Sequence, residues 1–392
     1  MMALTHVSVV GTIGIITLAI WLHLFFGRGW FWRVKKFDAD GIQIDPPRMW
    51  PKIVAVVPAR NEAVTIGDVI SSLVKQDYPG PFSIVIVDDH SDDSTADIAR
   101  RVAEENGPAE MVQILAASPL SEGWTGKLWA LNLGVDSTRS DPPAFYWFTD
   151  ADIAHAPDTL RRLVSRAVRD RLDLASLMVL LQARSLPERA LIPAFLYFFL
   201  MLYPPRWIAE EDLGTAGAAG GCILLRRKAL ESIGGFPAIR GEVIDDCALA
   251  KAIKHSGGLV WMGLTRKSQS LRVYGTWGEL RDLIARTAFT QLHYSALLLL
   301  GTLLGLGLTY VAPIVLLFAH DGTARILGCS AWVLMALSFL PAVRFYRLSP
   351  LWAPLLPLIA VFYSYATLLS AVRYWLGKGG QWKGRAQAPG ST

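Results

Sequence analysis

Four long apolar stretches constrain the fold of this chain more than any other feature of its sequence. They occupy residues 7–26, 297–318, 326–343 and 351–372, and each is close to the ~20 apolar residues that a helix needs to cross a lipid bilayer. Backbone N–H and C=O groups find no partner in hydrocarbon, so a single segment of this kind can cross a membrane only as a helix. We therefore expect membrane-spanning helices, combined with a more polar domain between the first and second stretches.

The composition agrees with this expectation. Hydrophobic residues make up 52% of the 392-residue chain and charged residues only 18%, which is more apolar than an ordinary soluble enzyme. The net charge of +5 suits a basic surface beside a membrane, and no motif indicates a nucleic-acid partner. The three cysteines, Cys222, Cys247 and Cys329, have neither metal-binding nor disulfide spacing, which favours a reducing compartment.

We interpret the first apolar stretch as a membrane anchor rather than a cleaved signal peptide. No Lys or Arg precedes it, and it is longer than the ~7–15 residues of a usual signal core. The cations that follow it place the next domain in the cytoplasm by the positive-inside rule; they are Arg28, Arg33, Lys35 and Lys36. Trp21, Trp30 and Trp32 are suited to the membrane interfaces. A multi-pass protein of the cytoplasmic (inner) membrane is expected, with its large domain facing the cytoplasm.

Strand and helix patterns alternate after the anchor. Apolar runs typical of strands at 52–57, 82–87 and 111–115, and a six-residue aromatic run that starts at Phe145, are separated by helical patterns. This alternation predicts an α/β domain with a mostly parallel sheet that is covered by helices on both faces. The expected organisation is an anchor at 1–27, a linker at 28–50, an α/β domain at 51–292, about three membrane helices at 293–376 and a polar tail at 377–392.

An apolar, aromatic run at 191–203 is too short to span a bilayer. Two interpretations stay open for it. A helix that lies in the membrane interface is favoured by the Pro204-Pro205-Arg206-Trp207 sequence behind the run. The alternative is a helix buried in the core of the protein.

The predicted aromatic strand that starts at Phe145 leads into two carboxylates, Asp150 and Asp152, one residue apart. Carboxylates are rarely buried unless they are paired or bound to a metal, and the carboxyl end of a strand is where open α/β sheets bind ligands. Mg²⁺ and Mn²⁺ prefer oxygen ligands and commonly take one or two carboxylates together with substrate phosphates. Alone, this pattern also fits an acidic turn, so the interpretation depends on the motifs around it.

Other polar residues are predicted at the same edge of the sheet. Pro58, Arg60 and Glu62 end the first strand, and Asp89 follows the second. Lys127 lies near the start of a helix, where a cation and free N–H groups favour a diphosphate. The pair Asp245-Asp246 opens a later helix. Each feature alone has an ordinary explanation, but their order on an α/β pattern favours one shared site.

These motifs resemble those of the inverting family 2 glycosyltransferases, which have the GT-A fold, a Rossmann-like nucleotide-sugar-binding fold. The resemblance extends over about residues 51–292 and rests on five motifs in the family's order. It implies that Pro58 to Glu62 and Asp89 hold the nucleotide base and ribose, with Lys127 near the diphosphate. It also implies that Asp150 and Asp152 bind the divalent cation, Mg²⁺ or Mn²⁺, and that Asp246 is the general base, supported by Asp245.

The last motif of the family, Gln or Arg, two residues, then Arg-Trp, is altered in this chain. Its best match is Arg286-Thr287-Ala288-Phe289-Thr290, which keeps the first position and replaces Arg-Trp by Phe-Thr. In processive synthases this motif helps to hold the polymer and the diphosphate, so its alteration disfavours processivity. Arg286 remains a candidate substrate contact.

The layout is similar to that of ceramide-glucosyltransferase-like enzymes and, more closely, of the hopene-associated glycosyltransferases. The resemblance implies transfer of a sugar, with inversion, from a nucleotide-sugar donor (a UDP-sugar is favoured) to a membrane lipid, with a hopanoid as the candidate. Three alternatives remain: a polyprenyl-phosphate glycosyltransferase, a polysaccharide synthase, and an inactive sugar-nucleotide-binding membrane protein. A dinucleotide-dependent oxidoreductase is disfavoured, because no G-x-G-x-x-G follows the first strand.

Overall fold

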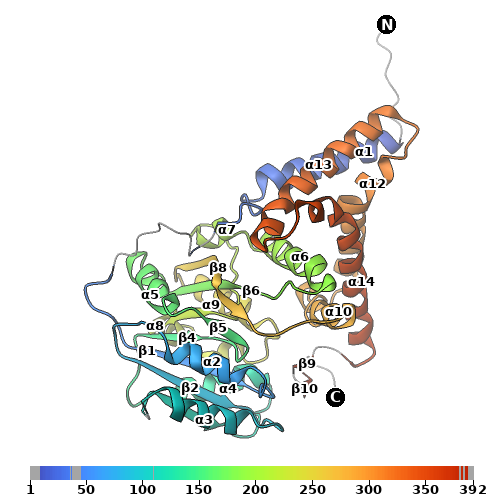
Figure 1. Ribbon diagram of the computed structural model, residues 1–392. Coiled ribbons are helices and arrows are strands. Elements are labelled where there is room, and N and C mark those ends of the chain that lie inside the picture. The colour runs from blue at the N-terminus through green and yellow to red at the C-terminus, as the bar shows by residue number, and fades with distance from the viewer. Residues whose placement is uncertain are drawn as a thin grey trace. The chain divides into compact units, whose positions relative to one another are not determined.

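The computed structural model describes residues 9–35, 37, 46–108 and 110–378, and the backbone of two short strands, β9 (Gln381–Trp382) and β10 (Arg385–Ala386) (Figure 1). Two compact units divide the chain. The sheet unit contains Lys35–Gln182 and Trp207–Val273, and the helical unit contains the chain up to Val34 together with Ala183–Arg206 and Tyr274–Gly380. Residues 183–206 and 274–292 therefore belong to the helical unit, although the sequence analysis grouped them with the α/β domain.

The sheet unit is built on an eight-stranded sheet with the strand order β3-β2-β1-β4-β7-β6-β8-β5. Its strands are β1 (Ile53–Ala59), β2 (Phe82–Asp88), β3 (Val112–Ala116), β4 (Phe145–Phe148), β5 (Ile153–His155), β6 (Leu174–Leu180), β7 (Ile223–Arg226) and β8 (Val260–Ser270). Pairing is parallel from β3 to β4 and between β6 and β8, and β7 and β5 pair antiparallel to their neighbours. The predicted α/β class is confirmed, in a mixed sheet with four parallel and three antiparallel strand pairs.

Helices cover the parallel half of the sheet on both faces, as its apolar strands require. On one face, alternate residues of β1 join a core cluster with α2 (Ile66–Val74) and α5 (Thr159–Arg169). On the other face α4 (Gly126–Asp136) packs closely, because Gly134 brings its backbone onto the strand. A Cβ atom at Gly134 would lie 2.4 Å from Val56 and 3.2 Å from Val87, so any side chain there would push α4 off the sheet.

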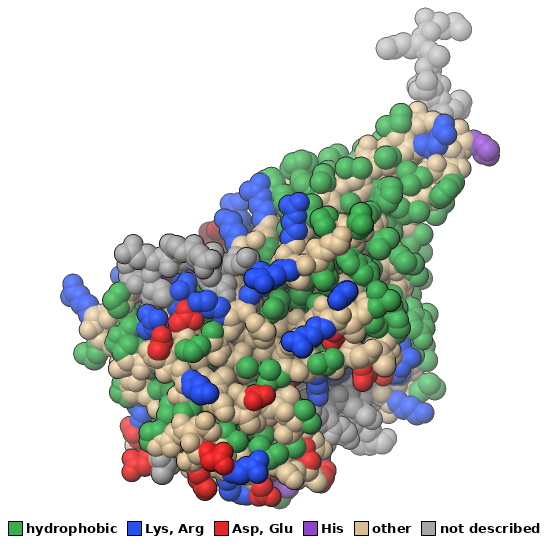
Figure 2. Space-filling view, in the orientation of Figure 1, with side chains coloured by type: hydrophobic (Ala, Val, Ile, Leu, Met, Phe, Trp, Pro, Cys, Tyr) green, Lys and Arg blue, Asp and Glu red, His purple; other side chains and the backbone are tan. Residues whose placement is uncertain are grey.

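Four helices of the described chain are long and apolar enough to cross a membrane: Val9–Gly27, Ala296–Leu316, Gly322–Phe345 and Pro350–Trp375. They match the four stretches that the sequence predicted. Figure 2 shows hydrophobic side chains gathered on the outside of this helical unit, where Leu297, Phe318 and Leu351 are among the most exposed. An outward apolar surface of this extent suits lipid rather than water.

The apolar run at 191–203 forms most of α6 (Leu186–Leu202), and it is a buried helix. Leu191, Tyr197 and Leu200 are each 1% exposed, and α6 contacts α10 (Trp277–Ala285), α13 (Gly322–Phe345) and α14 (Leu356–Trp375). The interpretation as a core helix is therefore the better description of this segment. Trp21, expected at a membrane interface, is likewise fully buried among helices of this unit.

Candidate active site

The carboxyl ends of the parallel strands bring the predicted site residues to one edge of the sheet. Parallel register pairs Ala59 of β1 with Asp88 of β2, and Val56 of β1 with Phe148 of β4. Residues that follow these strands must therefore leave the sheet at the same edge. Pro58 near the end of β1, Asp89 after β2 and Asp150 after β4 are placed in this way.

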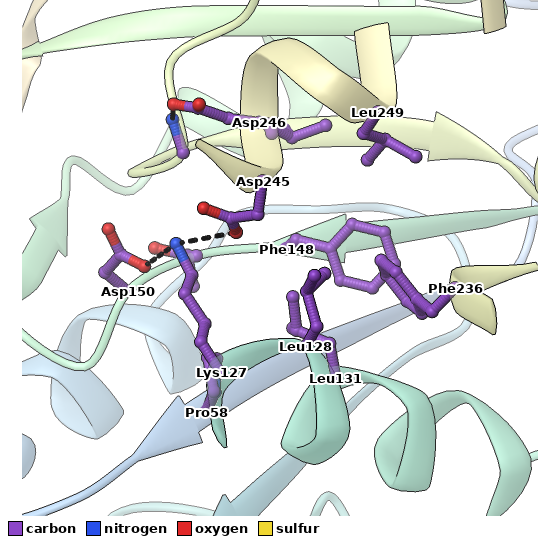
Figure 3. Close-up of a pocket in the computed structure, with 13 residues that line it drawn as sticks. Pro58, Lys127, Leu128, Leu131, Phe148, Asp150, Phe236, Asp245, Asp246 and Leu249 are labelled. Atoms are coloured by element: carbon purple, nitrogen blue, oxygen red, sulfur yellow. Dashed lines mark hydrogen bonds and ion pairs between the residues drawn. The ribbon is translucent and has the colours of Figure 1, made fainter. Parts of the chain in front are cut away.

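An open pocket lies at this edge, entirely within the sheet unit (Figure 3). Charged side chains line one part of the pocket and apolar side chains another, as Figure 3 shows. The lining residues are Pro58, Lys127, Leu128, Leu131, Phe148, Thr149, Asp150, Gly220, Ile223, Phe236, Asp245, Asp246 and Leu249. The structure thus brings together four of the predicted site residues, Pro58, Lys127, Asp150 and Asp246, from four separate segments.

Lys127 lies at the centre of the charged part. It belongs to the first turn of α4, which is capped at its start by the Thr125 hydroxyl. The Lys127 Nζ atom is 2.9 Å from Oδ1 of Asp150 and 3.2 Å from Oδ2 of Asp245. Burial lowers the pKa of this ammonium, but the carboxylates of Asp150, Asp245 and Asp246 raise that pKa by more, so Lys127 stays protonated.

Asp246 is held by backbone groups at the start of α9 (Asp245–His255). Its Oδ2 accepts a hydrogen bond from the N–H of Gly220 at 2.8 Å, and its Oδ1 accepts one from the N–H of Cys247 at 2.8 Å. Burial and then the charge of Asp245 raise the pKa of Asp246 to about 6, against the opposing effects of Lys127 and the two N–H groups. Asp246 is therefore ionised at neutral pH and still basic enough to take up a proton.

Gly220 lies close to both Lys127 and Asp246 in the charged part of the pocket. A Cβ atom there would lie 3.1 Å from Nζ of Lys127 and 3.3 Å from Oδ2 of Asp246. Here the absence of a side chain lets the backbone N–H reach the Asp246 carboxylate.

A buried histidine supports the turn that carries Asp150. The hydroxyl of Thr149 donates to the carbonyl of Gly221 at 3.0 Å, so it accepts from Nε2–H of His155, 2.8 Å away. The other ring nitrogen, Nδ1, then accepts from the hydroxyl of Ser268, also at 2.8 Å. Burial lowers the pKa of His155 to about 3, so the ring is neutral and this tautomer is fixed. The chain of hydrogen bonds joins the turn after β4 to β8 and to the loop around Gly220.

The loops after β1 and β2 are joined to each other by polar contacts. The Arg60 guanidinium donates to the backbone carbonyls of Asp89 and His90, and the Asp89 side chain is fully buried. The backbone N–H of Asn61 donates to the hydroxyl of Ser91 at 3.0 Å, and Asn61 and His90 both adopt positive φ. These contacts fix the two loops against each other.

Glu62 lies next to the same loops, and its N–H donates to the Thr95 hydroxyl at 2.8 Å. The structure therefore places Arg60 and Glu62, which follow β1, together with Asp89, which follows β2. Their role toward a nucleotide stays a prediction.

Asp150 and Asp152 differ in their relation to the pocket: Asp150 lines it, and Asp152 does not. Among the described residues, no group of three or more His, Cys, Asp or Glu is arranged to hold a metal ion. One or two carboxylates suffice where substrate phosphates complete the coordination of Mg²⁺, so the donor set at Asp150 fits a cation that binds with its substrate. Asp152 as a ligand stays a prediction.

Arg286 belongs to the helical unit, where it directly follows α10 and is exposed. Phe289, which stands where the family motif has Arg, is 1% exposed and packs edge-to-face against Tyr294, Tyr374 and Trp375. The altered position therefore has a structural explanation, since it fills an aromatic cluster of the helical unit. The role of Arg286 stays a prediction.

Sequence reasoning missed part of the pocket. Phe148, Phe236 and Leu249 form its apolar wall, and their hydrophobic character alone gave no sign of this. It also gave Asp245 only a supporting role and did not predict the ion pair with Lys127. The contacts of His155 had no sequence signal, because a single histidine after a strand is most often structural.

The comparisons with known proteins agree with this geometry. Residues 54–234, which run from the second residue of β1 to beyond β7, match the model of a family described as glycosyl transferase family 2. The probable glycosyltransferase YdaM of Bacillus subtilis is 25% identical over 245 residues, which are 61% of this chain and 54% of that protein. The beta-monoglucosyldiacylglycerol synthase of Synechocystis is 32% identical over 116 residues, which are 29% of this chain and 22% of that protein. The chain thus spans about half the length of the first relative and less of the second.

A solved structure is similar over nearly the whole chain. It is the mannosyltransferase PcManGT from Pyrobaculum calidifontis, determined in complex with GDP-Man and Mn²⁺. The two chains are 20% identical, the alignment covers 93% of this chain and 99% of the other, and the TM-score is 0.57. This likeness shows a common fold that includes the sheet and the apolar helices.

Proposed function

We propose that this protein, whose residues 54–234 match the glycosyl transferase family 2 model, transfers a sugar from a nucleotide-sugar donor to a membrane lipid, with inversion at the anomeric carbon. One observation carries the proposal. A single pocket brings together a protonated lysine, Lys127, and three carboxylates, Asp150, Asp245 and Asp246. These are the groups that displacement of a nucleoside diphosphate by a hydroxyl requires.

The leaving group must be stabilised as its bond to the anomeric carbon breaks. Lys127 provides a fixed positive charge for the diphosphate in a largely buried site, where electrostatic stabilisation is strongest. A divalent cation bound at Asp150, with Asp152 as the proposed second ligand, would supply further charge neutralisation on the diphosphate. PcManGT, which has the same fold, was solved with Mn²⁺, and this supports the proposal.

The acceptor hydroxyl must lose its proton as it attacks. Asp246 is proposed as the base, because its carboxylate is positioned by two backbone N–H groups and its pKa is raised to about 6. A base of this pKa can accept a proton in the transition state at neutral pH. Direct attack on the face opposite the leaving group inverts the configuration and needs no second nucleophile.

The donor is proposed to bind through the loops after β1 and β2. Pro58, Arg60, Glu62 and Asp89 would contact the base and ribose, and a UDP-sugar is the favoured donor by family resemblance. GDP-Man, bound by PcManGT, is the competing donor class. Arg286 is proposed as an additional substrate contact.

A lipid acceptor is supported by the four apolar helices and by the name of one relative, a beta-monoglucosyldiacylglycerol synthase. A hopanoid is the specific candidate, and it rests on the resemblance described above. We place the enzyme in the cytoplasmic membrane with the sheet unit in the cytoplasm, where nucleotide sugars are made. The cations Arg28, Arg33 and Lys35 after the first helix support this orientation.

The test is a transfer assay with the full chain in membranes. Radiolabelled UDP-sugars and GDP-mannose are supplied separately with Mn²⁺, and labelled lipids are extracted and identified by mass spectrometry. We expect label in one lipid class with one donor, and none with the Asp246→Asn variant. If label enters water-soluble products alone, or no product forms with any donor, the proposal of a lipid glycosyltransferase is wrong.

A further inference from the structure

The Lys127 ammonium forms an ion pair with Asp150, the carboxylate that we propose as a cation ligand. Its Nζ atom contacts Asp150, the proposed cation ligand, at 2.9 Å, and it contacts Asp245 at 3.2 Å from the other side. Figure 3 shows the side chain reaching from α4 to a point between the two carboxylates. Lys127 thus neutralises the same oxygen atoms that would attract Mg²⁺ or Mn²⁺.

The ammonium is held beside Asp150 in a partly buried site. The Lys127 side chain is 17% exposed, that of Asp245 is 19% exposed and that of Asp150 is 35% exposed. The backbone of Gly220 comes so close that an added Cβ atom would lie 3.1 Å from Nζ. A dication beside Asp150 would therefore lie close to a protonated ammonium, and two like charges at such a distance repel strongly in a partly buried site.

A nucleoside diphosphate that enters the pocket without a cation is repelled by the carboxylates. Three carboxylates, Asp150, Asp245 and Asp246, line the pocket with one ammonium, so the cluster is negative when all four groups are ionised. A dianionic diphosphate would be repelled by this charge. A dication and a diphosphate that arrive together neutralise each other, and the diphosphate oxygens give the ammonium a new partner.

Resting on the proposed function, we propose that Lys127 acts as a resident counter-ion that keeps Asp150 from binding a divalent cation until a nucleoside diphosphate is present. When both are present, the ammonium moves from Asp150 to the diphosphate, while Asp245 retains it. The cation and the donor then bind as a coupled pair, and each raises the affinity for the other by the same factor, as linkage requires. The pocket would thereby resist occupation by metal ions alone.

The experiment measures Mn²⁺ binding rather than turnover. Free Mn²⁺ is followed by electron paramagnetic resonance while it is titrated into the purified full chain in detergent, without nucleotide and with UDP or GDP. For the unaltered protein we expect weak Mn²⁺ binding that becomes at least about tenfold tighter with the correct nucleotide. For Lys127→Met we expect Mn²⁺ without nucleotide to bind at least about tenfold more tightly than to the unaltered protein, and the effect of the nucleotide to shrink.

Two further variants make the test specific. Lys267→Met removes a lysine from another ion pair of the sheet unit, with Asp158 at 2.6 Å, outside the pocket; it should leave Mn²⁺ affinity unchanged. Adding Asp150→Asn to Lys127→Met should abolish the gain, because the released ligand is then lost. A gain that survives Asp150→Asn would contradict the assignment to Asp150. Lys127→Gln, of similar length and uncharged, should reproduce the effect if Lys127→Met does not fold.

The outcomes separate this inference from the proposed function. If UDP or GDP binds with Mn²⁺ but Lys127→Met and Lys127→Gln bind Mn²⁺ no better than the unaltered protein, the counter-ion role is wrong and the glycosyltransferase proposal stands. If the unaltered protein binds Mn²⁺ equally well with and without nucleotide, the coupling is wrong. If neither nucleotide binds under any condition, the proposed function itself fails.

Discussion

The indole nitrogen of Trp21 donates a hydrogen bond to the carbonyl oxygen of Thr309, 2.8 Å away. In a regular helix this carbonyl would accept from the N–H of residue 313, but residue 313 is a proline and has none. Nearby, the hydroxyl of Thr17 donates to the carbonyl of Leu308 at 2.7 Å. Side chains of the first apolar helix thus satisfy carbonyls of the second, where its backbone is π-helical over Gly307–Val311. A membrane offers no water for this purpose, so the two helices depend on each other.

Replacing Trp21 by Phe is expected to destabilise the helical unit by about 1 kcal/mol, because the Thr309 carbonyl loses a donor while most of the packing remains. Thermal unfolding of the detergent-purified protein measures the effect. Trp375→Phe is the matched control, since Trp375 is 54% exposed. Equal midpoints for the two variants would show that the hydrogen bond contributes little.

The proposed base predicts unequal effects for two neighbouring carboxylates. Asp246→Asn should lower turnover by on the order of 10²–10⁴, the usual contribution of a positioned base, and leave donor affinity within a few-fold. Asp245→Asn should lower turnover less, because Asp245 contacts Lys127 and is not the group proposed to accept the proton of the acceptor hydroxyl. Turnover and donor binding are measured on both variants. Small and equal losses would remove Asp246 from the catalytic residues.

The raised pKa of Asp246 predicts a pH-dependent stability in the metal-free protein. The folded-state pKa of about 6 exceeds the usual unfolded value of about 3.9, so folding favours the protonated form. The stabilising contribution is complete below about pH 4 and is lost as the pH rises through about 6, on the order of 3 kcal/mol in all. Asp246→Asn should flatten this part of the stability curve. Asp97→Asn, at a side chain that is 82% exposed, should leave the curve unchanged.

Loss of His155 should affect both folding and donor binding. His155→Phe removes the partner of the buried Ser268 hydroxyl and of Thr149, which should cost about 2 kcal/mol. Because Thr149 precedes Asp150, we expect KM for the donor to rise more than kcat falls, and His155→Gln to restore part of the loss. His255→Phe, at an exposed histidine, is the control. A stability loss with unchanged donor KM would limit His155 to a structural role.

The proposed orientation predicts where a new thiol can be labelled. Ser118 is exposed in the sheet unit, whereas the native Cys222 and Cys247 are buried. In a Cys329→Ser background, Ser118→Cys should react with a membrane-impermeant maleimide in inside-out vesicles or lysed cells and stay unlabelled in intact cells. Labelling in intact cells would reverse the orientation.

Sequence periodicity predicted the parallel half of the sheet and the four apolar helices well, because both depend on local patterns. The strand β8 was not predicted, since its second half is polar and contains Ser268 and Ser270, which are buried only by tertiary contacts. The antiparallel direction of β7 could not be predicted from the sequence either. It depends on the path of the intervening chain, which leaves the sheet unit to form α6.

The candidate site was predictable as far as strand ends fix positions. Asp150 and Pro58 follow from the parallel register, and Lys127 follows from the start of α4. The packing of α9 beside these residues could not be predicted, because a local sequence pattern does not determine which part of the sheet a helix contacts. The contacts between Lys127 and Asp245 and between Asp246 and Gly220 therefore emerge only from the folded chain.

A fragment that ends at Gln182 contains Pro58, Lys127 and Asp150 but neither Gly220 nor Asp246. The chain enters the helical unit at Ala183 to make α6, and it returns to the sheet unit only at Trp207. During synthesis, Lys127 and Asp150 are therefore made before α6, and Gly220 and Asp246 are made after it. A pocket that contains both Lys127 and Asp246 can therefore form only after α6 and the later segment that carries Asp246 have been made.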